Sequence, residues 1–124
     1  MADAMSGLVS AVAALPGLRP CRSCGCFRNP ADADDSRQWF EVVVELDEVN
    51  GAPTPEGWSS LAFLTASVNS LAMAGRAVEL SVDAAARPGQ RRQIFLAIEG
   101  ELEDITPAEL VGWLHDLALV EAAA

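Results

Sequence analysis

Six consecutive residues, Cys21-Arg22-Ser23-Cys24-Gly25-Cys26, contain all three cysteines of the chain. Thiolates are soft ligands, and Cys-x-x-Cys spacing lets two sulfurs hold one tetrahedral zinc ion. Cys26 could add a third sulfur, because Gly25 allows the backbone to turn back. The fourth ligand would be the sole histidine, His115, or a residue of a second chain. The candidate zinc or iron site therefore consists of Cys21, Cys24, Cys26 and His115.

Two other interpretations of the cysteines stay open. A thiol-redox centre needs Cys-x-x-Cys at the start of a helix, where the helix dipole lowers the thiol pKa. We expect no helix after Cys24, because the following segment contains Gly25, Asn29 and Pro30. In a reducing compartment the thiols could also remain unligated, and an odd number of cysteines does not form a closed set of disulfides. We expect reduced, unligated thiols and no resident cofactor, with zinc or iron binding or thiol exchange as the alternative.

The sequence contains no catalytic signature. G-x-S-x-G is absent, and His115 offers the only imidazole. The chain has no lysine, which excludes Schiff-base chemistry and the GxxxxGK phosphate loop. The acidic residues around Asp32 and Glu101 lack the ordered spacing of a calcium loop. We therefore expect a protein that is not an enzyme.

The charge of the chain restricts its partners. Eighteen acidic residues oppose 8 basic ones, and the formal net charge is -10. Nucleic-acid binding needs cationic side chains that displace phosphate counterions, so this charge argues against it and against anionic membranes. No stretch approaches the ~20 apolar residues of a membrane span, and the apolar N-terminal segment has no preceding positive charge. We expect a cytoplasmic protein with a protein partner.

Length and periodicity predict the fold. The 124 residues, 51% of them hydrophobic, indicate a single domain over residues 1–124. Residues 19–37 carry the cysteines, prolines and an acidic run, so we expect an irregular loop there, with at most a short strand near Cys26-Phe27. Helical spacing and caps predict helices at 3–15, at 58–74 and from the capping box Thr106-Pro107-Ala108-Glu109 onwards. Alternation predicts strands at 38–47, 77–84 and 91–99. The order α-(β)-β-α-β-β-α is typical of an α+β fold, with an antiparallel sheet packed against helices.

The clearest strand, residues 38–47, has a half-apolar outer face. Phe40 and Val42 belong to its buried face, whereas Trp39 and Val43 share the other face with glutamates. Apolar residues on an outer face indicate a partner surface.

Three features of the second half resemble the type III secretion chaperones and their wider bacterial relatives. They are the helix Leu61–Ala72, the strand pair 77–84 and 91–99, and the segment Leu102–Leu110 that leads into the last helix. The resemblance covers residues 58–120. It implies a small, acidic, cytosolic α+β protein, commonly dimeric, in which the strands before the second helix and the outer helix surfaces hold an extended partner segment. In this chain the implied strand residues are Trp39 and Val43.

These observations give one leading hypothesis for the function. We expect a non-enzymatic, chaperone-like homodimer that holds a partner polypeptide on apolar helix and strand surfaces. The first helix would contribute Leu8 and Val12, and the outer strand face would contribute Trp39 and Val43. We expect neither nucleic acid nor membrane as a partner. The alternative is a small metal-binding or thiol-redox protein that uses the three cysteines.

Overall fold

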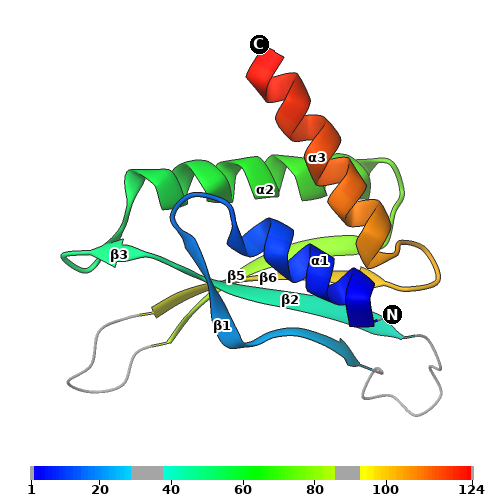
Figure 1. Cartoon of the computed structure of the whole chain (residues 1–124), viewed down its shortest axis with the longest axis horizontal. Helices are drawn as coiled ribbons and strands as arrows, with labels where there is room; N and C mark the ends of the chain where they lie inside the picture. Colours follow the sequence, from blue (N-terminus) through cyan, green and yellow to red (C-terminus); the bar gives the residue numbers. More distant parts are fainter. Residues whose placement is uncertain (1, 29–37, 86–92, 124) are drawn as a thin grey trace.

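The computed structural model describes the backbone of residues 2–28, 38–85 and 93–123, and the side chains of residues 5–19, 38–84 and 93–118. Within these segments, three helices pack against antiparallel sheet, so the α+β class expected from the sequence is confirmed (Figure 1). The elements are α1 (Ala2–Ala13), β1 (Leu18–Arg28), β2 (Trp39–Leu46), β3 (Glu48–Val49), β4 (Ala52–Pro53), α2 (Pro55–Met73), β5 (Val78–Ala85), β6 (Gln93–Glu101) and α3 (Pro107–Ala123).

The main sheet has four strands in the order β1-β2-β6-β5, and every neighbouring pair is antiparallel. β2 and β6 therefore form its centre, and β1 and β5 form its edges. Val44 lies opposite Leu96, and Phe40 lies opposite Gly100. The three described helices lie on one and the same face of this sheet (Figure 1). None of them is long and apolar enough to cross a lipid bilayer.

The core lies between the sheet and the helices. Successive side chains of a strand point to opposite faces, so the alternation in residues 38–47 places every second residue of β2 under the helices. The α2 stripe expected from helical spacing is also in the core, with Leu64, Val68 and Leu71 buried and Leu61 partly buried. The residues with at most 2% exposure include Leu8, Val12, Phe40, Val42, Val44, Leu46, Leu64, Ser67, Leu96, Ile98, Ile105 and Leu110.

Residues 18–28 form the edge strand β1, where we expected an irregular loop. The expectation came from Pro20 and Gly25, which interrupt a strand pattern. β1 nevertheless pairs with β2 on both sides of these residues, and the register is irregular between them. An edge strand tolerates proline and bulges because one side of its backbone has no neighbour. The rest of the expected loop, residues 29–37, lies outside the described residues.

Local signals at turns and helix starts agree with the sequence. Glu109 N donates to Thr106 Oγ1 at 3.1 Å, and Thr106 N donates to Glu109 Oε1 at 3.3 Å, which confirms the capping box of α3. The turn-rich connection after β2 contains the hairpin β3–β4. Asn50 and Gly51 have φ angles of 54° and 80°, the positive values that a tight two-residue hairpin turn needs.

Candidate functional site

The sheet face opposite the helices, which we call the open face, carries the two strand residues singled out from the sequence. Trp39 and Val43 lie on it because they alternate with the buried residues of β2. On β6 the same face carries Phe95 and Ala97, and Ala97 lies directly opposite Val43. All four side chains are partly exposed. Val43, Ala97 and Phe95 therefore form an apolar centre on the two central strands, whereas Trp39 lies two residues further along, opposite Glu101.

Carboxylates border this apolar centre. Glu41 of β2, Glu99 of β6 and Glu79 of β5 are register partners and form one row across three strands, between Trp39 and the Val43–Ala97 pair. Directly opposed side chains in an antiparallel sheet have Cβ atoms about 5 Å apart, so this row concentrates negative charge. Glu79 and, further along β5, Asp83 are exposed. The border of the apolar centre is therefore acidic.

An ion pair between an exposed arginine and a buried glutamate closes the other end of the open face. Arg19 of β1 is the register partner of Glu45, and its Nη2 donates to Glu45 Oε1 at 2.8 Å. Gln93 Nε2 donates to the same oxygen at 3.2 Å. The hydrogen bond with Glu45 raises the pKa of the Arg19 guanidinium. Because Glu45 is only 9% exposed, these donors compensate the loss of water around its carboxylate.

The expected role of the first helix needs a correction. Leu8 and Val12 both have 0% exposure and belong to the core cluster. An amphipathic helix with a single apolar stripe uses that stripe to pack on the sheet, so no surface of these two side chains is left for a partner. Of the four expected contact residues, Trp39 and Val43 remain on a surface. The structure adds Phe95 and Ala97 to this surface. In the sequence, the alternation along residues 93–99 is the only signal of their outward position.

The structure does not test the metal hypothesis, which stays a prediction. The backbone of Cys21, Cys24 and Cys26 lies in β1, and Cys26 is the register partner of Glu41, but their side chains lie outside the described residues. His115 is exposed on α3. Among the described side chains, no group of three or more histidines, cysteines or acidic residues could hold a metal ion.

A cavity of about 540 Å³ lies where the end of α1, the first turns of α2 and the second half of α3 meet. Its walls are mostly apolar, and Glu56 is the one ionisable residue among the described residues that line it. General acid–base chemistry needs positioned titratable groups within reach of one another. A single carboxylate at the rim of an apolar cavity does not provide such a pair.

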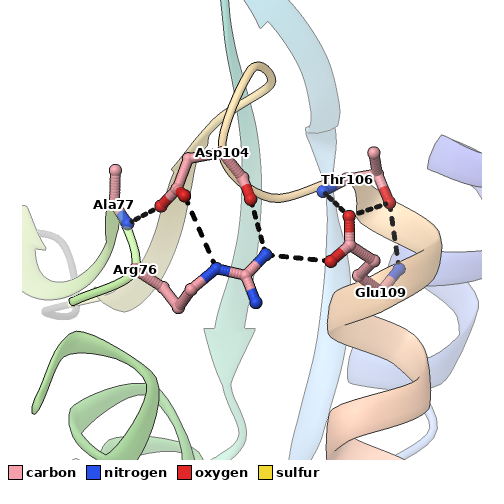
Figure 2. A network of polar contacts seen from close by, with 5 residues as sticks. All are labelled: Arg76, Ala77, Asp104, Thr106 and Glu109. Carbon is pink, nitrogen blue, oxygen red and sulfur yellow. Dashed lines mark hydrogen bonds and ion pairs between the residues drawn. The ribbon is translucent and has the colours of Figure 1, made fainter. Parts of the chain in front are cut away.

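The densest polar network joins the start of β5 to the start of α3 (Figure 2). Arg76 Nη2 donates to the backbone oxygen of Asp104 at 2.5 Å and to Glu109 Oε2 at 2.8 Å. The Asp104 carboxylate also accepts a hydrogen bond from the backbone N–H of Ala77. Thr106 completes the network through the capping box. The groups satisfy one another, so the network fastens two elements together and leaves no ligand site between them.

This network predicts a pH-dependent contribution to stability. The hydrogen bond from Arg76 is the main cause that lowers the pKa of Glu109 from its ordinary 4.5. A carboxyl whose pKa is lower in the folded state stabilises the fold above its unfolded pKa and loses this effect as the pH falls through the folded value. Arg76→Gln should therefore lower the melting temperature at neutral pH. The difference from wild type should shrink as the pH falls below about 4.5.

Thermal denaturation followed by circular dichroism at several pH values measures this effect. Asp116→Asn, which neutralises an exposed carboxylate of the same helix, is the control and should change the melting temperature little. Equal melting temperatures of wild type and Arg76→Gln at neutral pH would contradict the role of Arg76. A difference that stays constant into acid would contradict the role of Glu109.

The chain was compared with protein-family models, with curated proteins and with solved structures, and none of the three comparisons finds a match. The argument for a function therefore depends on the geometry of the described residues, above all on the open face.

Proposed function

We propose that this protein is a non-enzymatic, chaperone-like domain that holds a partner polypeptide on the open face of its sheet. One observation carries the proposal: the described helices lie together on one face, while the opposite face presents Val43, Phe95 and Ala97 together and Trp39 on the far side of a row of glutamates. Antiparallel sheets that cover one face with helices commonly expose the other face to water. The residues that point to this exposed face are then polar. Here the outward positions of the central strands include two aromatic rings.

The chemistry of the border indicates the kind of partner. The chain has a net charge of -10, and Glu79 and Asp83 are exposed beside the apolar centre. Such a surface attracts a cationic chain and repels an acidic one. The partner that fits best is a short apolar segment flanked by basic residues, with the apolar side chains on Val43 and Phe95 and the flanking basic ones at the carboxylates.

We propose in addition that the domain works as a homodimer, as the resemblance to secretion chaperones implies. The open face is a poor surface for pairing two copies, because its acidic rows would approach the same rows of the second copy. Self-association and partner binding therefore need different surfaces. The acidic exterior would keep the complex of domain and client in solution.

A designed peptide tests the proposal without knowledge of the natural partner. The probe is a short peptide with valines at its centre and arginines at both ends, and its control has glutamate in place of arginine. Titration into the isotopically labelled protein should shift the amide resonances of Trp39, Val43, Phe95 and Ala97 with the basic peptide only. Val43→Lys should weaken binding at least tenfold, a loss of about 1.4 kcal/mol that is modest for the centre of an interface.

Ser10→Lys is the matched control. It makes the same change of net charge at an exposed position of α1, on the helical side of the molecule. If both lysine variants weaken binding equally, the attraction is a general effect of net charge and the open face has no special role. Resonance shifts confined to the helices would likewise refute the proposal.

A further inference from the structure

One of the three asparagines of the chain, Asn50, precedes a glycine, Gly51. The other two are followed by proline, at Asn29, and by serine, at Asn69. The side-chain carbon Cγ of an asparagine is open to attack by the backbone nitrogen of the next residue. A glycine leaves that nitrogen unshielded because it has no Cβ. A proline nitrogen has no hydrogen to give up, which excludes Asn29 from this reaction.

Asn50 and Gly51 form the turn of the hairpin β3–β4, which lies outside the main sheet. The pairing of this hairpin consists of two residue pairs, and Val49 lies opposite Ala52 next to the turn. Both turn residues are exposed. Apart from the chain neighbours, no described atom lies within 4 Å of the place that a Cβ would take at Gly51. Water therefore reaches both residues of the turn.

The φ angles identify the turn as type I′. Asn50 has φ 54° and Gly51 has φ 80°, and type I′ is the two-residue hairpin turn with positive φ at both positions. This turn type sets the ψ angle of its first residue to about +30°. At that angle the Gly51 nitrogen points away from the Asn50 side chain. The turn as it stands therefore keeps the two reacting atoms apart.

A flip of the peptide unit between Asn50 and Gly51 brings the reacting atoms together. The flip converts type I′ into type II′, the other common two-residue hairpin turn, and moves the ψ angle of Asn50 to about −120°. For an L residue, this ψ angle places the next nitrogen alongside Cβ and within reach of Cγ. Gly51 reverses the sign of its φ angle, which glycine does at little cost. The strands β3 and β4 need not separate, because both turn types are hairpin turns.

From this geometry we infer that Asn50-Gly51 is a site of spontaneous deamidation. The Gly51 nitrogen gives up its proton and bonds to Asn50 Cγ, the bond between Cγ and Nδ2 breaks, and the side-chain nitrogen leaves as ammonia. The product is a five-membered cyclic imide. One water molecule then opens the ring. Cleavage between Cγ and the Gly51 nitrogen gives aspartate, and cleavage between the backbone carbonyl carbon of residue 50 and that nitrogen gives isoaspartate.

Both products change the hairpin. Each adds a carboxylate close to Asp47 and Glu48, in a chain that already has a net charge of -10. Isoaspartate also lengthens the main chain by one carbon, so the two-residue turn cannot persist. At the base of the hairpin, Thr54 N donates to Asp47 O at 3.1 Å, and Thr54 Oγ1 accepts from Gly57 N in the first turn of α2. The modified turn therefore lies directly before the residue that caps α2.

The structure also sets the relative rate of the reaction. The first position of a type II′ turn is normally glycine, so the flipped turn is a sparsely populated state when Asn50 occupies that position. The folded protein should therefore react more slowly than a free peptide of the same sequence. Asn69 is the internal control. The helix α2 engages the following backbone N–H in a hydrogen bond, and Asn69 Nδ2 donates to Met73 Sδ at 3.5 Å.

Peptide mapping by mass spectrometry measures the reaction. The full chain and a synthetic peptide of residues 46–55 are incubated at mildly alkaline pH, which helps the backbone nitrogen to lose its proton. Asn50 of the folded protein should be converted about tenfold or more faster than Asn69, a difference of about 1.4 kcal/mol in activation free energy. An Asn50 that stays intact while the peptide is converted overturns the inference. Equal rates in protein and peptide overturn the role of the turn.

Two further measurements identify the route. Opening of the imide gives isoaspartate together with aspartate, whereas direct hydrolysis of the side-chain amide gives aspartate alone, so a product without isoaspartate overturns the inference. Arg76→Gln, which should destabilise the fold at neutral pH and above, separates the flip of the turn from unfolding. Asn50 should react at the same rate in this variant and in wild type. A rate that rises with the loss of stability would show that Asn50 reacts in the unfolded chain, and would overturn the inference.

Discussion

Gly17→Ala should destabilise the protein by about 3 kcal/mol or more. Gly17 has φ +76°, a left-handed conformation that costs a residue with a side chain about 1 to 2 kcal/mol. A Cβ atom at this position would also lie 2.2 Å from Gly57 N and 2.5 Å from Gly57 Cα in the first turns of α2. The obstacle is backbone, which cannot rotate away as a side chain can. Small domains are stable by only about 5–15 kcal/mol, so this loss is severe.

The effect would reach beyond the turn itself. Asp47 N donates to Gly17 O at 2.9 Å, and Ser60 Oγ donates to Pro16 O at 2.5 Å. The turn after α1 therefore holds the end of β2 and the start of α2 together. An added methyl group would push α2 away from this turn.

Gly75→Ala is the matched control for this prediction. Gly75 has φ +87°, but no atom lies within 4 Å of the position that a Cβ would take. It should therefore show the conformational cost alone, about 1 to 2 kcal/mol. Urea denaturation followed by tryptophan fluorescence measures both variants. Equal losses for the two alanines would show that Gly17 and Gly57 are not in close contact.

The elements that local patterns determine were predictable. Helical spacing located α2 within a few residues, alternation located β2, β5 and β6, and the Thr106–Glu109 capping box marked the start of α3. Each of these signals depends on residues close together in the sequence. The edge strand β1 was missed for the same reason, because its structure depends on backbone pairing with β2 rather than on its own proline- and glycine-containing sequence.

The candidate surfaces were only partly predictable. Alternation placed Trp39 and Val43 on an outer face and could do the same for Phe95 and Ala97, but it gave no strand register, so the position of Ala97 opposite Val43 could not be derived. The apolar stripe of α1 was assigned to a partner, although the sheet needs that stripe as its cover: Leu8 and Val12 are fully buried. A sequence pattern shows that a face is apolar, and only the tertiary structure shows what covers it.

Gly100→Ala should disturb the sheet at the place where the open face is built. Gly100 of β6 lies opposite Phe40 of β2, and a Cβ there would lie 2.4 Å from Phe40 Cζ and 3.0 Å from Ile105 Cγ2. Phe40 has 0% exposure, so its ring has no free space to enter. Overpacking of this kind costs about 1 to 3 kcal/mol. It would also move β6 relative to β2, and with them the neighbouring open-face residues Trp39 and Glu99.

A second substitution can show that the ring is the cause. Phe40→Leu alone leaves a cavity and should cost roughly 1 to 2 kcal/mol, less than a Phe→Ala change. In the double variant the alanine methyl enters the space that the ring vacates, so the combined loss should be smaller than the sum by about 1 kcal/mol or more. Gly112→Ala, an exposed helix position with no atom within 4 Å, should instead stabilise the protein slightly. Additive losses in the double variant would show that Gly100 is required for another reason than the Phe40 ring.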